Sequence, residues 1–336
     1  MNYKIYFLKF LTPVHFADSK FGGDLDKASF YCSADTYFNA ICSEANLISK
    51  EIVNNIIEKF EQRELVISSL FPYYYSSVDD DLQLYLPKMC IPVDNLSNIN
   101  SYSEQKKYSR LLKKNNQQEF IRVSEIKKWI KSNNDKQLYC IENPVFAITN
   151  TMEKVACRQK EPLPYFVNSY KFNHNAGLYF ILGYKDEIDV EIIEPIIKSL
   201  GYSGIGGKKS SGYGKYEFFD DAIELNEDNS IYKDDLLLTK MINTNNGIKL
   251  CIAPVLPKQK DVQYITVGNY KLAKHGGFIY DQNTHNKKRK NIVYMLAEGS
   301  CLMKSLTGIM LKEDYEGISY PIYRNGMGMF VGIDYE

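Results

Sequence analysis

Glycine and lysine are concentrated in one segment, residues 201–216, which reads GYSGIGGKKSSGYGKY. Six of these sixteen residues are glycine and three are lysine, and no acidic residue follows before Glu217. Glycine adopts positive φ without strain and has no Cβ, so such a loop can turn its amides toward a ligand that approaches the backbone. The lysines add positive charge, and two serines add short donors. The segment predicts an anion-binding loop, with phosphate as the anion; a flexible connector is the alternative.

The elements expected on either side of this loop argue against the common nucleotide-binding loops. Residues 189–200 have apolar residues at helical spacing, and residues 214–219 have the composition of a strand. Mononucleotide and dinucleotide sites use the reverse order, strand, loop and then helix. The Walker A pattern fails because Tyr202 stands where its first glycine belongs, and G-x-G-x-x-G fails at Lys209. We therefore expect neither ATP nor NAD to bind this loop.

Length and composition limit the remaining possibilities. The chain has 336 residues, enough for two domains with sizeable cores. Its formal net charge is +0, so a site for a polyanion must be a local patch. The 27 tyrosines suit base stacking, although an AT-rich genome would also raise the tyrosine content.

The cysteines and the hydropathy pattern indicate a cytoplasmic protein. The seven cysteines are scattered, with no C-x-x-C pair, which is typical of reduced, buried thiols and gives no zinc ribbon. Residues 1–8 are too short and too polar for the apolar region of a signal peptide. No run of eighteen apolar residues is present, so no membrane span is expected. We predict no metal site and no cofactor.

Residues 1–225 alternate between strand and helix patterns. The order strand–helix–strand, insertion, strand–helix–strand predicts a ferredoxin-like βαββαβ unit. Its insertion is the polar segment 93–136, which contains a helical candidate at 123–130. The expected elements are a strand at 3–11, a helix opening at Ser33, a helix at 51–63, hairpins at 69–88 and 145–165, a strand at 170–184, and the helix and strand that flank the loop at 201–214.

Residues 225–229 are polar and predict a boundary between domains. Beyond it, residues 230–336 alternate again, with strands expected at 247–255, 278–280, 292–297 and 329–333. We interpret this part as a second, degenerate unit of the same kind. The predicted fold class is α+β, with two ferredoxin-like (RRM-like, βαββαβ) domains, hairpin and loop insertions, and a glycine-rich loop.

A glycine-rich loop between the last helix and the last strand of a ferredoxin-like unit resembles the RAMP superfamily of CRISPR RNA-binding proteins. Further segments narrow the resemblance to the family of fourth subunits of the type III-A CRISPR Csm complex, over nearly the whole chain. These segments are 15–16, 33–38, 70–73, 86–88, 270–272, 276–278, 297–300 and 321–324.

The resemblance implies two RRM-like domains and a place at the foot of the complex. There such a subunit grips the repeat-derived 5′ handle of the crRNA and contacts the large polymerase-type subunit and the first backbone RAMP subunit. The resemblance also implies that the protein is not the nuclease. The alternatives are an endoribonuclease that matures the same RNA with His15 as general acid or base, and a scaffold whose glycine loop contacts protein.

Loop chemistry and the resemblance together select a set of candidate RNA-binding residues. They are His15, Phe16, Lys20, Ser33, Arg158, Gly204, Gly206, Gly207, Lys208, Lys209, Ser210, Ser211, Gly212, Tyr213, Lys271, Lys274, His275 and Arg324.

Four groups have a structural explanation beside the functional one. Asp24 and Asp26 suit a turn as well as a metal pair. The segment Lys287–Lys290 suits an exposed loop as well as a phosphate patch, and Arg158 suits an exposed hairpin tip. Aromatic residues at 71 and 73 are more typical of a strand core than of base stacking.

Overall fold

The structure is a computed structural model that describes residues 1–17, 24–92, 101–134, 139–158, 161–280, 287–318 and 320–334. Its α-helices are α1 (Ala34–Ala45), α2 (Lys50–Glu61), α3 (Tyr102–Gln117), α4 (Ile126–Asn134), α5 (Glu187–Ser203), α6 (Lys233–Asn243) and α7 (Val262–Ile265). Single 3-10 turns lie at Val123–Glu125, Lys209–Ser211 and Gln259–Asp261. The described helices include none with the length and apolar composition needed to cross a membrane.

The strands alternate with these helices. They are β1 (Asn2–Phe10), β2 (Phe16–Ala17), β3 (Ala28–Ser29), β4 (Leu65–Ile67), β5 (Phe71–Ser76), β6 (Asp81–Pro87), β7 (Phe120–Arg122), β8 (Ala147–Arg158), β9 (Glu161–Phe172), β10 (Ala176–Tyr184), β11 (Tyr216–Phe218), β12 (Ile223–Glu224), β13 (Ile248–Ala253), β14 (Leu272–His275), β15 (Phe278–Tyr280), β16 (Lys287–Arg289), β17 (Val293–Leu296), β18 (Cys301–Leu302), β19 (Ile309–Glu313), β20 (Ile322–Gly326) and β21 (Met329–Ile333).

The largest sheet has the spatial order β11-β1-β10-β5-β6-β7. Strand β1 is antiparallel to β10 and to β11, and β10 is antiparallel to β5. Consequently β1 runs parallel to β5 with β10 between them, and β10 runs parallel to β11 with β1 between them. Because α1 lies between β1 and β5 in the chain and α5 lies between β10 and β11, these are two interleaved β-α-β units, as in ferredoxin-like folds. All nine residues of β10 are buried, as expected at the centre of a covered sheet.

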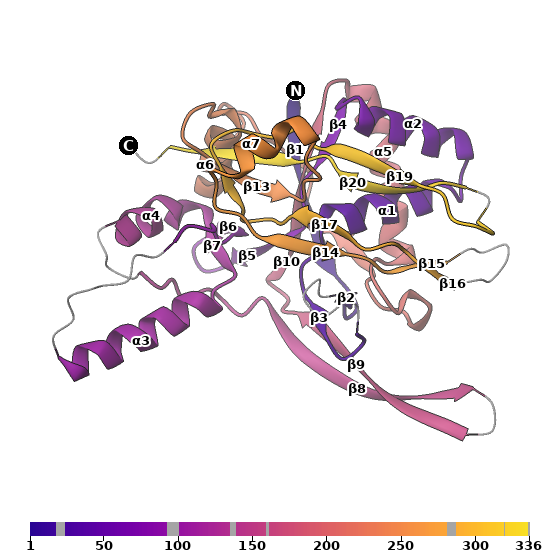
Figure 1. Ribbon diagram of the computed structural model, residues 1–336, viewed down its shortest axis with the longest axis horizontal. Helices are drawn as coiled ribbons and strands as arrows, with labels where there is room; N and C mark the ends of the chain where they lie inside the picture. Colours follow the sequence, from indigo (N-terminus) through magenta and orange to yellow (C-terminus); the bar gives the residue numbers. More distant parts are fainter. Residues whose placement is uncertain are drawn as a thin grey trace.

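Helices α1, α2 and α5 lie together beside this sheet (Figure 1). Helix α5 begins where the Asp186 side chain accepts a hydrogen bond from the Ile188 amide, 3.1 Å away. It ends at Gly204, whose φ of 80° is accessible to glycine at little cost. The glycine-rich loop therefore starts directly at the carboxyl end of α5 and leads into β11.

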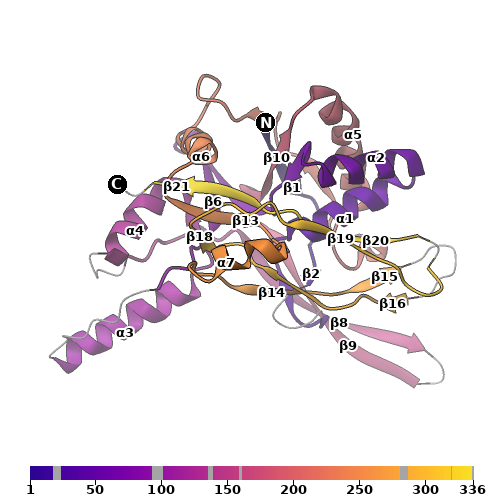
Figure 2. The same ribbon diagram turned by 45° about the horizontal axis from the view of Figure 1, so that its top comes forward.

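Two elements project from the body in different directions (Figures 1 and 2). One is the hairpin of β8 and β9, which pair over twelve residues each and form a separate two-stranded sheet within the described residues. The predicted hairpin is thus confirmed and is longer than expected. The other is α3, which the sequence analysis did not predict. The helical candidate at 123–130 is confirmed as a 3-10 turn followed by α4.

The C-terminal part contains α6, the three-stranded sheet β18-β13-β21, and the two-stranded ladders β14–β17, β15–β16 and β19–β20. The four strands expected here are confirmed. A single cluster of buried apolar side chains extends from β1 and β10 into β13 and β21. The mixed helix and antiparallel-sheet architecture agrees with the predicted class, whereas the division near residue 230 and the presence of two complete ferredoxin-like domains stay predictions.

Candidate functional site

The glycines hold the loop at 201–214 tightly against the chain that follows β1. The Gly207 amide donates to the carbonyl oxygen of His15 at 2.8 Å, and the Gly214 amide donates to that of Pro13, also at 2.8 Å. A Cβ on Gly206 would lie 2.7 Å from the His15 carbonyl oxygen, and one on Gly207 would lie 2.6 Å from the His15 ring. Side chains at these positions would push the loop away. Most glycine amides are therefore used inside the protein and do not point toward a ligand.

The residues between the glycines form the outward part of the loop. Lys208 has a left-handed backbone (φ 62°) and is followed by the 3-10 turn Lys209–Ser211, which Gly212 closes with φ 82°. The amides of Lys208, Lys209 and Ser210 have no hydrogen-bond partner among the described residues. Successive amides at a left-handed to right-handed reversal form a concave site for anions. This part of the loop therefore has the backbone geometry of an anion site, with two lysine side chains beside it.

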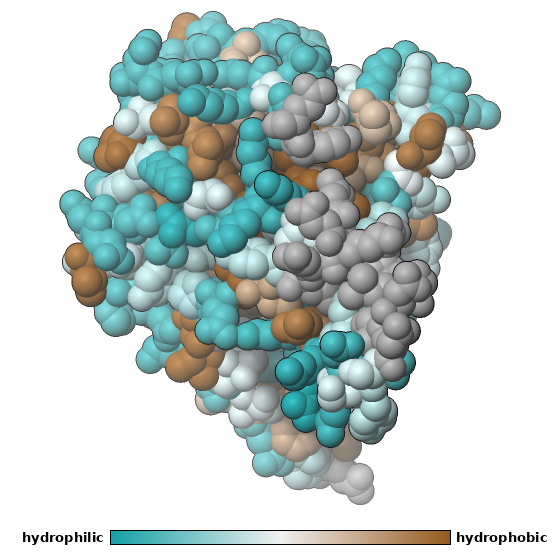
Figure 3. Space-filling model, turned by 90° about the vertical axis from the view of Figure 1, so that its left-hand side faces the viewer, coloured by the Kyte–Doolittle hydropathy of each residue, from teal (hydrophilic) through white to brown (hydrophobic). Residues whose placement is uncertain are grey.

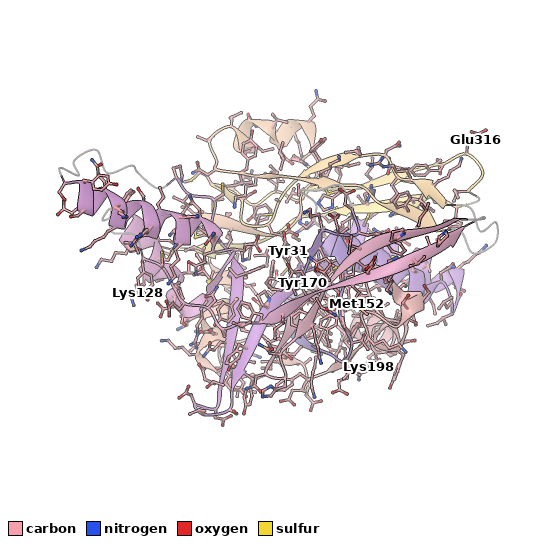
Figure 4. All side chains as sticks on the ribbon, turned by 90° about the horizontal axis from the view of Figure 1, so that it is seen from below. Tyr31, Lys128, Met152, Tyr170, Lys198 and Glu316 are labelled. Carbon is pink, nitrogen blue, oxygen red and sulfur yellow. The ribbon has the colours of Figure 1, made fainter. Side chains whose placement is uncertain are left out.

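The hairpin of β8 and β9 lies beside the loop. The Lys208 ammonium lies 3.2 Å from the Tyr165 hydroxyl and 4.6 Å from the centre of its ring. The Tyr213 hydroxyl donates to the sulfur of Met152, and the Lys154 ammonium lies 5.0 Å from the Tyr213 ring centre. Lys154 and Tyr165 are paired across the hairpin, so their side chains share one face. Figure 4 marks Met152 on this hairpin, seen from below the body.

His15 and Phe16 support the loop from beneath. His15 is only 4% exposed, and its Nδ1 lies 2.7 Å from the carbonyl oxygen of Asn168 on β9. Phe16 is 3% exposed and packs against Phe10. His15 thus joins the hairpin to the glycine loop through its ring and its carbonyl. No carboxylate pairs with its ring among the residues that the structure describes.

A second group of candidates surrounds the buried carboxylate of Asp35 at the start of α1. Its Oδ2 lies 3.4 Å from a terminal nitrogen of Arg324 and 3.5 Å from Nδ1 of His275. Burial alone would raise the pKa of the Asp35 carboxyl, but hydrogen bonding to His275 and the charges of His275, Arg324 and Lys290 hold it below its ordinary value. Arg324 is 2% exposed and also pairs with Glu313. Its guanidinium is therefore occupied by protein groups.

Ser33 occupies the N-cap position of α1, as predicted, but its side chain does not cap the helix. The Ala34 amide instead donates to the Ser69 hydroxyl at 2.8 Å, and Ser69 in turn donates to Glu298. The Ser33 hydroxyl is buried and has no partner in the described part of the chain. Sequence patterns contain no signal for Ser69 as the cap, because it lies between β4 and β5, 35 residues after the helix start.

Of the remaining candidates, Lys271 and Lys274 belong to the C-terminal part. Lys271 is exposed at the start of the β14 region, and Lys274 is paired across β14 and β17 with Tyr294. Arg158 ends β8, and its side chain lies outside the described residues. Lys20 lies entirely outside them. The structure thus brings His15, Phe16 and the loop together, and brings His275 and Arg324 to Asp35.

Two aromatic and two acidic residues of the sequence analysis occupy structural positions. Phe71 and Tyr73 are buried, which confirms that they belong to the core. Asp24 and Asp26 are exposed at a turn in which the Lys27 amide donates to the Asp24 carbonyl. Among the described residues, no three His, Cys, Asp or Glu side chains are placed to hold a metal ion.

Comparison with known families identifies the fold. The family model described as the RAMP superfamily matches residues 7–217, which include the end of β1, α1, the hairpin and the glycine loop. This chain belongs to the RAMP superfamily. Residues 244–333 match a second family model, the CRISPR Csm4 C-terminal domain.

Two curated relatives share this similarity along almost their entire length. The chain is 25% identical over 323 residues to the CRISPR system Cms protein Csm4 of Streptococcus thermophilus, covering 96% of this chain and 95% of the relative. It is 23% identical over 338 residues to the protein of the same name from Mycobacterium tuberculosis (strain CDC 1551 / Oshkosh), covering 99% and 98%. The chain is therefore a Csm4-like RAMP protein.

Two solved structures have the same fold. A crystal structure of a Csm3-Csm4 subcomplex in the type III-A CRISPR-Cas interference complex contains a chain that matches with a TM-score of 0.61 and 20% identity, covering 99% of this chain and 100% of that one. A crystal structure of a Csm1-Csm4 cassette in complex with pppApA matches with a TM-score of 0.59 and 16% identity, covering 100% and 99%.

Proposed function

We propose that this protein is a non-catalytic, crRNA-binding subunit of a type III-A CRISPR Csm complex. It holds the repeat-derived 5′ handle of the crRNA and joins the large polymerase-type subunit to the backbone RAMP subunits. Membership of the RAMP superfamily and similarity to Csm4 proteins over nearly the whole chain support this proposal.

One observation carries the RNA-binding part of the proposal. The amides of Lys208, Lys209 and Ser210 stand unpaired at a backbone reversal, and the two lysines add charge to the same spot. A phosphate matches both features, because it accepts several hydrogen bonds and carries negative charge. Phosphate contacts fix the position of a strand but carry no base sequence. The loop is therefore a holding site for the RNA backbone.

The hairpin extends this site toward the bases. Tyr165 offers an aromatic ring and a hydroxyl next to Lys208, and Phe166, on the opposite face of β9, is 56% exposed. Aromatic rings stack on unpaired bases with little dependence on sequence. A single strand whose phosphates lie on the loop would have the Tyr165 ring within the same surface, whereas the Phe166 ring lies on the other face of the hairpin. This arrangement suits unpaired RNA better than a regular duplex.

Exposed apolar side chains on the C-terminal part support the proposal that this protein binds neighbouring subunits. They lie on and beside the ladder of β14 and β17 and comprise Val267, Tyr270, Leu272, Phe278, Ile292 and Tyr294, with exposures from 44% to 73%. Exposed apolar side chains that gather near one ladder are typical of protein interfaces. The solved relatives whose fold this chain shares were crystallised as Csm3-Csm4 and Csm1-Csm4 assemblies. We assign this surface to a neighbouring subunit.

The geometry around His15 supports a non-catalytic role. A general acid or base must reach the proton that it transfers, within hydrogen-bond distance or through one water molecule. The His15 ring is buried and is held by the backbone of Asn168. We expect the His15→Ala variant, like the wild type, to leave the repeat RNA uncleaved.

The test uses the full chain and labelled CRISPR repeat RNA, and it scores retention, cleavage and the salt dependence of binding. Changing Lys208 and Lys209 to Ala should weaken RNA binding. It should also make the negative slope of log binding constant against log salt concentration shallower by about 1.4, since each phosphate contact on a single strand contributes about 0.7. The matched control changes Lys50 and Lys240, which are exposed and have no ion pair in the described chain. An unchanged slope in the loop variant would contradict the proposal, and metal-independent cleavage by the wild type would favour the endoribonuclease.

A further inference from the structure

Helix α3 concentrates positive charge on a chain that is neutral overall. It carries five basic residues and one acidic residue, a formal charge of +4, whereas the whole chain has a net charge of +0. Successive residues of a helix are rotated by about 100°, so all five basic side chains fall within an arc of about 120°. We call this arc the basic face of α3; it comprises Lys106, Lys107, Arg110, Lys113 and Lys114.

The basic face is free to meet a ligand. All five side chains are exposed, and of the five only Lys114 has an ion pair in the described chain, with Glu142 at 2.7 Å. Like charges that are three or four residues apart destabilise a helix, and Arg110 has such neighbours on both sides. A helix that needed only to be soluble would mix both signs along this face. The absence of acids from the arc therefore points to an anionic partner.

The structure anchors this helix at its carboxyl end. Asn115 is its one buried residue, and the Lys88 ammonium donates to both the carbonyl oxygen and the side-chain oxygen of Asn115. Burial lowers the pKa of Lys88 to about 8, with a further contribution from the charge of Lys271. At the other end, the Ser101 hydroxyl accepts from the Glu104 amide at 3.2 Å. The helix is thus a capped arm that is fixed at its base.

The arm lies far from the glycine loop across the underside of the molecule. Figures 1 and 4 show α3 and the hairpin of β8 and β9 extending toward opposite ends. Figure 3 faces the side from which α3 projects, where most of the described surface is hydrophilic. One short strand segment would therefore not contact both surfaces.

We propose that the basic face of α3 binds the phosphate backbone of a nucleic-acid strand, at a site separate from the glycine loop. This inference rests on the proposed RNA-binding function, because it assigns a second contact to the same class of ligand. Lys106 and Lys114 are eight residues apart, so the face spans about 12 Å at 1.5 Å per residue.

Side-chain chemistry favours nucleic acid over an acidic protein surface. A helix that docks into a protein groove presents apolar anchors at helical spacing in the middle of its contact face. On α3 the apolar residues Tyr108, Leu111 and Leu112 lie outside the basic arc, toward the side of Asn115. The arc itself contains Ser103 and Gln117 besides the basic residues. Charge without apolar anchors is the pattern of sequence-independent phosphate binding.

The test compares three variants of the full chain. The arm variant changes Lys106, Arg110 and Lys113 to Ala, which keeps high helix propensity. The loop variant changes Lys208 and Lys209 to Ala. The control variant changes the exposed residues Lys50, Lys240 and Lys312 to Ala and removes as much charge as the arm variant. Circular dichroism and melting temperature confirm that each variant is folded.

The probes are fluorescent polyuridine RNAs of about 40 and about 8 nucleotides, titrated at several salt concentrations. For the long RNA, we expect the arm variant to bind at least tenfold more weakly than the wild type at low salt. The negative slope of its log binding constant against log salt concentration should become shallower by about 2, at about 0.7 per lost phosphate contact. For the short RNA, the arm variant should lose less affinity than the loop variant loses. The control variant should stay within about twofold of the wild type.

Each outcome decides between the two surfaces. If the arm variant matches the control on the long RNA, the arm proposal is wrong, whatever the loop variant does. If the loop variant matches the wild type while the arm variant loses affinity, the loop assignment fails and the arm assignment stands. If the arm variant keeps RNA binding but no longer co-purifies with a co-expressed neighbouring subunit, the basic face binds protein and the proposal is overturned. A wild type that does not bind the long RNA overturns both.

Discussion

The buried charge cluster around Asp35 gives a quantitative test of how the two ends of the chain are held together. Asp35 lies in the first turn of α1, and Arg324 lies 289 residues later, on β20. The Asp35→Asn variant keeps the shape of the side chain and one oxygen, so the amide of Asn325 can still donate to it. The change therefore removes mainly the negative charge that faces Arg324 and His275.

The expected loss of stability follows from the surroundings of Arg324. Removing one partner of a buried ion pair costs about 3–5 kcal/mol, because the other charge stays buried. Arg324 keeps Glu313 at 3.4 Å and the carbonyl oxygen of Asn291 at 3.0 Å, so the lower end, about 3 kcal/mol, applies. With an unfolding entropy of about 2.1 cal/mol/K per residue over 336 residues, this lowers the melting temperature by about 4 °C.

Thermal unfolding at neutral pH measures this change, with the exposed Asp228→Asn substitution as the matched control. The pH dependence has a defined sign. Because the folded pKa of Asp35 lies below its ordinary value of 3.8, its stabilisation is complete above that value and is lost as the pH falls through the lower, folded pKa. The difference in melting temperature between the Asp35→Asn variant and the wild type should therefore shrink as the pH falls below about 4.

A double variant separates charge pairing from general damage. If the pair is the cause, Asp35→Asn combined with Arg324→Met should cost about 1–3 kcal/mol less than the sum of the single changes. Additive effects, or a melting temperature for Asp35→Asn within about 1 °C of the wild type, would show that the cluster does not stabilise the fold through charge.

Two further pairs of variants test local geometry. Gly206→Ala places a Cβ against the His15 carbonyl oxygen at a φ of 85°, so it should displace the loop, destabilise the protein and weaken RNA binding. At Gly212 the φ is similar, 82°, but the space around a Cβ is open. Gly212→Ala should therefore cost only about 1 kcal/mol of backbone strain. Equal RNA affinities for these two variants would argue against a role of the loop position. Ser69→Ala removes the cap of α1 and should cost about 1–2 kcal/mol, whereas Ser33→Ala removes a hydroxyl without a partner and should be nearly neutral. Chemical denaturation checks both, and the reverse order would contradict the assigned cap.

The local pattern of apolar and polar residues predicted most of the helices and strands, because their periodicity depends on residues that are close in sequence. It missed α3 because the apolar residues of this helix beyond its first turn are confined to Tyr108, Leu111 and Leu112, too few for a continuous apolar stripe. Ser101 and Glu104 nevertheless form a recognisable helix start. The pattern located the hairpin but not its register, so it did not predict that Lys154 pairs with Tyr165.

Long-range contacts were beyond the reach of the sequence. Arg324 was predicted to bind RNA because it is basic. The residues next to it in sequence do not indicate that it is buried and paired with Asp35. The same holds for Ser69, which caps a helix that begins 35 residues earlier. Residue type gives the chemistry that a side chain can perform, whereas the partner that uses it depends on the tertiary fold.

The glycine loop shows how these two levels combine. The sequence correctly marked a segment of unusual backbone, but the glycines at 206, 207 and 214 serve to bring the loop against residues 13–16. The free amides belong to Lys208, Lys209 and Ser210, which lie between the close contacts. Glycine therefore determines where the loop lies, and the residues between determine what it offers to a ligand. A substitution at Gly206 and one at Lys209 should accordingly differ in effect: the first changes the stability of the protein as well as its affinity for RNA, and the second changes the affinity alone.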